Sequence, residues 1–159
     1  MNLSQCIIEG FRIFPDSEAL FFEGDRYSYA DLERLSGKAA VALRDLGVEK
    51  GDRVALRLPN LPAFPVWYYG ALRIGAIAVS VNTRLAPDEV EFILGDCGAE
   101  VLVTAEGEES PEGFDGRTVF VSEDGATADG KSLEEGKGLS AGEYLDCDPD
   151  DPAIILYTS

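Results

Sequence analysis

Residues 53–104 decide the fold: RVALRLPNLPAFPVWYYGALRIGAIAVSVNTRLAPDEVEFILGDCGAEVLVT. Three pieces of this stretch have the length and composition of strands. Arg53 to Leu58 alternates polar and apolar residues, as a strand with one covered face does. Ala76 to Val81 and Val101 to Thr104 are short apolar runs, which are typical of strands inside a sheet that is covered on both faces.

Two predicted helices separate these strands. Val66 to Ile74 is apolar almost all round and ends at Gly75, which predicts a deeply buried helix with Asn60 as its N-cap. Pro87 opens a second, shorter helix. The series strand, helix, strand, helix, strand predicts parallel strands joined by right-handed crossovers. The fold class is therefore α/β, with a parallel βαβαβ sheet and helices on both faces.

A hairpin and a long helix are predicted before this unit. Ala19 to Phe22 and Arg26 to Ser28 flank a Glu-Gly-Asp turn, a pattern that indicates a small hairpin. Ser28 and Asp31 form a capping-box signal, and the apolar residues that follow fall on one helical face until a glycine offers a left-handed stop. We expect a helix from Tyr29 to Leu46.

After residue 104 the chain is acidic and rich in glycine, and it then returns to a strand-like sequence. Residues 101–159 carry 15 acidic and 3 basic groups. Residues 105–152 predict a mobile, solvated excursion that is interrupted by one short strand at Arg117 to Val121. Pro152 to Tyr157 predicts a final buried strand. We expect residues 1–159 to form a single α/β domain.

The composition excludes several classes of function. The 159 residues include 30 acidic, 13 basic and no histidine side chains, for a net charge of −17. Catalytic triads and metal sites that need an imidazole are therefore excluded. The negative charge disfavours binding to nucleic acid or anionic lipid. Three separated cysteines without a C-x-x-C pair predict a reducing, cytoplasmic location. No transmembrane segment is expected, because the chain lacks a run of about 18 apolar residues.

Thr158 and Ser159 follow the last predicted strand directly. Ligands of an open parallel sheet bind in the crevice at the carboxyl ends of the strands, so this hydroxyl pair is well placed for a phosphate. Serine and threonine after a strand are nevertheless more often turn formers or N-caps. The pair alone does not establish a site.

A family resemblance is carried by five segments: Tyr29–Leu32, Gly47–Ala55, Leu58–Asn60, Gly75–Leu85 and Asp151–Ser159, the last of which contains the hydroxyl pair. In this order and spacing they resemble the adenylate-forming enzymes, the family of acyl-CoA synthetases, firefly luciferase and the adenylation domains of nonribosomal peptide synthetases. The resemblance covers the chain except for its acidic excursion. Asn82–Leu85 and the residues that follow look more like the fatty-acyl and aryl-CoA ligases than like the peptide synthetases.

The resemblance implies a two-step ligase. A carboxylate attacks the α-phosphate of Mg-ATP to give an acyl-adenylate and pyrophosphate, and a thiol, usually coenzyme A, then displaces AMP. ATP, Mg²⁺ and coenzyme A would be cofactors of the parent enzyme, and a small carboxylic acid its substrate. Thr158 and Ser159 match the first two residues of the family's phosphate-binding loop. No catalytic residue and no metal ligand can be carried over, so we expect an N-terminal fragment that is inactive and binds no cofactor by itself.

Two other readings remain open: a naturally short, non-catalytic α/β interaction or regulatory module, and a flavodoxin-like domain that binds another nucleotide. The aromatic run Trp67–Tyr69 is expected in the core and not in a ligand site. Cys97 is expected to be a buried apolar residue, and Arg84 to form a surface salt bridge or a cap. In a fragment, the predicted helix at residues 66–74 and the outer face of the last strand would be partly bare. This predicts a homo-oligomer that buries them.

Overall fold

A seven-stranded sheet lies at the centre of the chain, and the computed structural model describes residues 2–158. The strand order is β8-β7-β6-β5-β3-β4-β9. Five neighbouring strands are parallel: β6, β5, β3, β4 and β9. The strands β7 and β8 form an antiparallel edge beside β6. The bounds are β3 Arg53–Arg57, β4 Ile77–Ser80, β5 Ala99–Ala105, β6 Arg117–Val121, β7 Thr127–Ala128, β8 Lys131–Ser132 and β9 Ile154–Leu156. The predicted parallel α/β sheet is confirmed.

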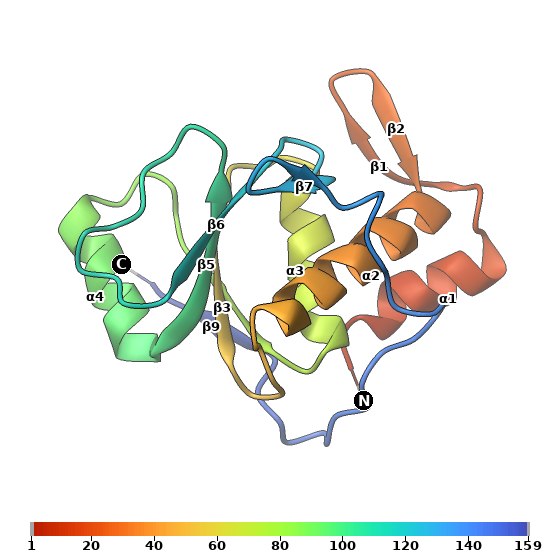
Figure 1. Cartoon of the computed structure of the whole chain (residues 1–159). Helices are drawn as coiled ribbons and strands as arrows, with labels where there is room; N and C mark the ends of the chain where they lie inside the picture. Colours follow the sequence, from red (N-terminus) through yellow and green to blue (C-terminus); the bar gives the residue numbers. More distant parts are fainter. Residues whose placement is uncertain (1, 159) are drawn as a thin grey trace.

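Helices cover both faces of this sheet, as predicted (Figure 1). The helices α2 (Tyr29–Asp45) and α3 (Ala63–Arg73) lie on one face, with α1 (Gln5–Ile13) packed on α2, and α4 (Pro87–Cys97) lies on the other. Side chains of β3 alternate between two core clusters. Val54 and Leu56 join the cluster with α2 and α3, whereas Ala55 joins the cluster with α4. Burial on both faces explains the apolar runs in the strand sequences.

The predicted capping box fixes the beginning of α2. The Asp31 N–H donates to Ser28 Oγ at 3.1 Å, and the Ser28 N–H donates to Asp31 Oδ2 at 3.0 Å. The hydrogen bond from the Ser28 side chain is the main cause that lowers the pKa of the Asp31 carboxyl. The predicted hairpin precedes this helix as β1 (Glu18–Phe22) and β2 (Asp25–Ser28), which project from the rest of the chain (Figure 1).

The beginning of α3 differs from the prediction. Asn60 is not its N-cap, because the helix starts at Ala63 with Pro62 in the capping position. The Ala63 N–H donates to the Glu123 carbonyl at 2.9 Å, so a distant loop satisfies the donor at the helix start. Trp67 is fully buried, and its indole N–H faces the Gly125 carbonyl at 3.3 Å. The prediction that Trp67 belongs to the core is confirmed.

The last strand was wrongly predicted to be buried. β9 lies at the edge of the sheet beside β4, and its residues are half-buried or exposed. Leu156 is 70% exposed. An edge strand has a neighbour on one side only, so its apolar sequence does not ensure burial. The helix α3, in contrast, is not bare as expected: α2 covers it, and a Cβ on Gly70 would lie 2.9 Å from the Cβ of Ala39.

Parts of the segment 105–152 pack on the core more closely than a solvated excursion would. The strand β6 lies where predicted, but β7 and β8 follow it. Leu139 and Tyr144 pack against the cluster that contains α2 and α3. The Lys38 ammonium donates to three backbone carbonyls, those of Leu133, Glu134 and Gly136, at 2.9–3.1 Å. The segment is therefore attached to α2 at several points.

A buried ion pair makes a further attachment. Arg73 Nη2 of α3 lies 2.8 Å from Glu33 Oε1 of α2, and the two side chains are 0% and 8% exposed. Arg73 Nε also donates to the Glu143 carbonyl at 2.9 Å, and the Gly142 N–H donates to Glu33 Oε1 at 2.9 Å. One pair of side chains thus joins two helices to the segment that leads to β9.

Candidate functional site

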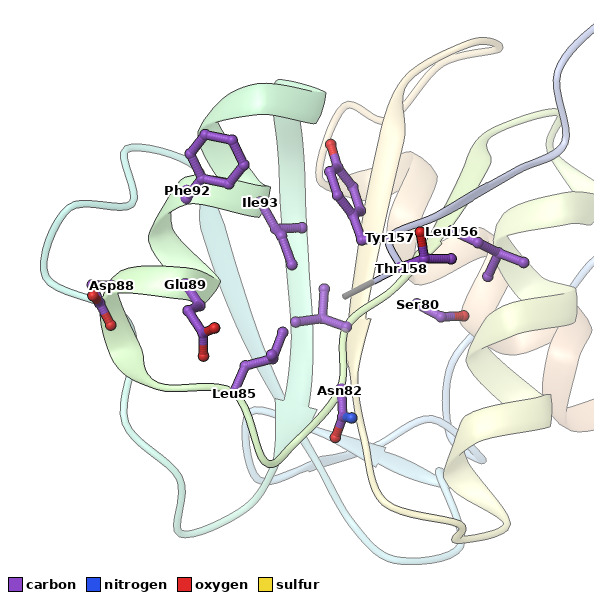
Figure 2. A pocket seen from close by; sticks show the side chains of 11 residues that line it. Ser80, Asn82, Leu85, Asp88, Glu89, Phe92, Ile93, Leu156, Tyr157 and Thr158 are labelled. Atoms are coloured by element: carbon purple, nitrogen blue, oxygen red, sulfur yellow. The ribbon is translucent and has the colours of Figure 1, made fainter.

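A cavity of about 610 Å³ opens at the carboxyl ends of β4 and β9. The helix α4 forms its other wall (Figure 2). Its apolar lining consists of Val81, Leu85, Phe92, Ile93 and Leu156, and its polar lining of Ser80, Asn82, Asp88, Glu89, Tyr157 and Thr158. Open parallel sheets bind their ligands at this edge, so the fold itself favours a site here.

Two of the polar residues stabilise the backbone around the cavity. Asn82 Oδ1 accepts a hydrogen bond from the Arg84 N–H at 2.9 Å, which closes the turn after β4. Glu89 Oε2 accepts one from the Ala86 N–H at 2.8 Å, which closes the first turn of α4. These two side chains therefore have structural roles that the sequence analysis did not assign. No ion pair of Arg84 is seen among residues 2–158, so its expected salt bridge does not form in the described structure.

Tyr157 crosses from β9 to α4 beside the cavity. Its hydroxyl donates to Asp96 Oδ2 at 2.6 Å. This hydrogen bond is the main cause that raises the pKa of Tyr157 to about 12. Its ring packs against the core cluster of α4, so consecutive residues at the end of β9 point in opposite directions: Tyr157 toward α4 and Leu156 away from it (Figure 2).

Thr158 lies exposed at the end of β9 and lines the cavity. Ser80 of the neighbouring strand β4 lines the same cavity, so two hydroxyl side chains lie at this edge (Figure 2). Ser159, the other predicted phosphate contact, lies outside the described residues. Within residues 2–158, no three acidic, cysteine or histidine side chains are grouped to hold a metal ion. No helix of that range is long and apolar enough to cross a membrane.

Arg57 is a polar residue of this edge that the sequence analysis did not single out. Arg57 is the last residue of β3. The next strand along the chain, β4, lies on one side of β3, and the strand after it, β5, lies on the other side. The strand order therefore reverses direction between β3 and β5, and such switch points are where open α/β sheets bind ligands. A second cavity of about 560 Å³ lies there. Arg57 Nη1 pairs with Glu108 at 3.0 Å, whereas its Nε is buried without a hydrogen-bond partner in the described structure. Strand order, which is invisible in a single sequence, gives Arg57 this position.

Cys97, at the end of α4, is half-buried and not fully buried as expected, and it packs against the core cluster of α4. Burial raises the pKa of its thiol, which disfavours the thiolate.

The fold is that of an α/β protein, and its first cavity, which Thr158 lines, opens at the carboxyl ends of parallel strands. Residues 9–159 match the family model of the AMP-binding enzymes, and the chain belongs to this family. The family resemblance found in the sequence is thereby confirmed.

The chain is similar to CoA ligases over most of its length. It is 39% identical over 139 residues to the long-chain-fatty-acid–CoA ligase FadD13 of Mycobacterium tuberculosis, which covers 84% of this chain and 27% of that protein. It is 38% identical over 109 residues to the crotonobetaine/carnitine–CoA ligase of Salmonella paratyphi A, covering 65% of this chain and 21% of that protein.

A solved structure has the same fold. The N-terminal domain of FACL13 from Mycobacterium tuberculosis matches with a TM-score of 0.82 at 30% identity, covering 100% of this chain and 42% of that one. The chain therefore spans about a quarter of the length of the curated relatives that it matches.

Proposed function

We propose that this chain is the N-terminal part of an ATP-dependent, AMP-forming acyl-CoA ligase. The observation that carries the proposal is its membership of the AMP-binding enzyme family together with 39% identity to a long-chain-fatty-acid–CoA ligase. Since the chain spans 27% of that relative, we assign the catalytic residues to polypeptide outside it. The 159-residue chain is accordingly expected to be inactive alone.

In this proposal Thr158 and Ser159 bind the phosphates of ATP. Thr158 presents a hydroxyl at the carboxyl end of β9, and Ser80 presents another from β4. Hydroxyl and backbone N–H donors at this position suit phosphate oxygens. Bound ATP supplies the phosphorus atom that the carboxylate substrate attacks. We assign no residue of this chain to Mg²⁺, because the family resemblance carries no metal ligand over to this sequence.

The names of the relatives support the rest of the proposal. They support a carboxylic acid as substrate, a fatty acid in the first case, and coenzyme A as the thiol acceptor. The alternative of an aryl acid rests on the resemblance of Asn82–Leu85 to the fatty-acyl and aryl-CoA ligases. We place the reaction in the cytoplasm, since three cysteines that are far apart in the sequence and form no C-x-x-C pair suit a reducing compartment.

Acid-dependent exchange of radiolabelled pyrophosphate into ATP tests the proposal. The complete gene product should catalyse exchange with fatty or aryl acids and form the CoA thioester on addition of coenzyme A. The 159-residue chain, assayed in parallel, should show neither reaction. Complete protein that forms no adenylate with any acid of these classes would refute the assignment.

A further inference from the structure

The chain leaves the sheet at the end of β9. The pairing of β9 with β4 ends with Leu156 opposite Ser80, and Thr158 is exposed. Between them, the Tyr157 side chain turns back to α4 and donates to Asp96 at 2.6 Å. The ring of Tyr157 packs against the core cluster that contains Ile93 of α4. Tyr157 therefore lies beyond the last residue pair of β9 and β4, and its side chain holds it to α4.

Asp96 is an unfavourable residue for its place in α4. It lies in the last turn before the C-cap Gly98, and this turn contains no basic residue. The negative end of the helix dipole disfavours a carboxylate there. The hydroxyl of Tyr157 offsets this cost by donating a hydrogen bond to the charge. Residues that conflict with the local preference of their element are expected at functional positions.

We propose that Tyr157 and Asp96 are positioning residues, which fix the direction in which the chain enters the phosphate-binding segment at Thr158. This role rests on the proposed ligase function. A displacement of about 1 Å in a positioned group can change a rate or an affinity severely, whereas the hydrogen bond itself is exposed and contributes little to folding. The hydrogen bond between Tyr157 and Asp96, called the Tyr157–Asp96 tie below, therefore contributes to ATP binding more than to stability.

Three substitutions separate positioning from folding. Tyr157→Phe removes the donor and Asp96→Ala removes the acceptor. Asp96→Asn keeps a side-chain oxygen that can accept the hydrogen bond from the Tyr157 hydroxyl, so this variant should behave like the wild type. Melting temperatures of all three should stay close to that of the wild type, because Asp96 is exposed and Tyr157 keeps its ring in Tyr157→Phe.

Amide hydrogen exchange of the peptide 150–157 tests the tie directly. Exchange should be about three- to tenfold faster in Tyr157→Phe and Asp96→Ala, and close to wild type in Asp96→Asn. Equal exchange in all variants would overturn the proposal, whether or not the protein is a ligase.

Pyrophosphate exchange by the complete protein tests the consequence. The KM for ATP should rise about three- to tenfold in Tyr157→Phe and Asp96→Ala, with kcat within about twofold, and the double variant should be no worse than either single one. Ser110→Ala is the matched control, because it breaks another exposed hydrogen bond of 2.6 Å, to Thr118 of β6, and three strands lie between β6 and β9.

A KM for ATP that is unchanged in Tyr157→Phe, or equally raised in Ser110→Ala, would overturn the proposed role. Wild-type protein without exchange activity would instead refute the ligase function, and hydrogen exchange would still decide whether the tie holds the end of β9.

Discussion

Replacing Arg73 by methionine should destabilise the chain by about 3–5 kcal/mol, the cost of removing one partner of a buried ion pair. Arg73 is fully buried and Glu33 nearly so. Burial lowers the pKa of the Arg73 guanidinium, although the nearby Glu33 carboxylate opposes this shift. In Arg73→Met the Glu33 carboxylate stays buried with the Gly142 N–H as its donor. The Glu143 carbonyl also loses a donor.

Urea unfolding followed by the fluorescence of Trp67 measures this change, because the single tryptophan of the chain is fully buried. The control is Arg26→Met, which breaks an ion pair with Glu18 whose side chains are 73% and 41% exposed. It should cost no more than about 1 kcal/mol. Replacing Arg73 and Glu33 together by methionine should cost less than the sum of the single changes, since no lone buried charge remains. A loss in Arg73→Met no greater than that in the control would refute the reasoning.

Three further predictions concern capping, helix packing and association. Ser28→Ala should lower the free energy of unfolding by about 1 kcal/mol in urea titrations. Because the Ser28 hydrogen bond lowers the folded pKa of Asp31, that carboxylate stabilises the fold above its unfolded pKa and loses this effect as the pH falls through the folded one. The deficit of Ser28→Ala should therefore shrink on acidification, and a constant deficit would contradict this origin. Gly70→Val forces a side chain against α2 and should lower the free energy of unfolding by about 1–3 kcal/mol. In the control Gly95→Ala the new methyl group meets open space, so this change should be neutral or stabilising. Similar thermal midpoints for both variants would disprove the packing argument. Sedimentation velocity should find the 159-residue chain self-associated and Leu156→Glu more monomeric, because Leu156 is 70% exposed; a monomeric wild type would rule this out.

Local signals in the sequence were sufficient for the parallel sheet and for most element boundaries. The capping box at Ser28 and Asp31 placed α2, and the apolar runs placed β4 and β5. The helix α1 is not among the predicted elements, and its N-cap Ser4 makes no side-chain capping hydrogen bond. Asn60 failed as an N-cap because a backbone carbonyl from residue 123, distant in sequence, satisfies the start of α3. Local patterns do not encode such long-range partners.

The site was predictable only in part. The position of Thr158 after a strand and the family motifs predict a site at the edge of the sheet where the first cavity lies, and this assignment stays a prediction. The bond between Tyr157 and Asp96 joins residues 61 positions apart, and the special place of Arg57 depends on strand order. The edge position of β9 is likewise a property of the assembled sheet, which is why its apolar sequence wrongly predicted a buried strand.

The central claim, that this chain carries the beginning of the phosphate-binding loop of an acyl-CoA ligase, is tested most directly by pyrophosphate exchange in the complete protein and in its Thr158→Val variant. We predict exchange that requires a fatty or aryl acid in the wild type, and a KM for ATP raised about tenfold or more in the variant, which loses a hydroxyl donor to phosphate. Exchange that does not respond to the substitution, or no exchange with any such acid, would contradict the account.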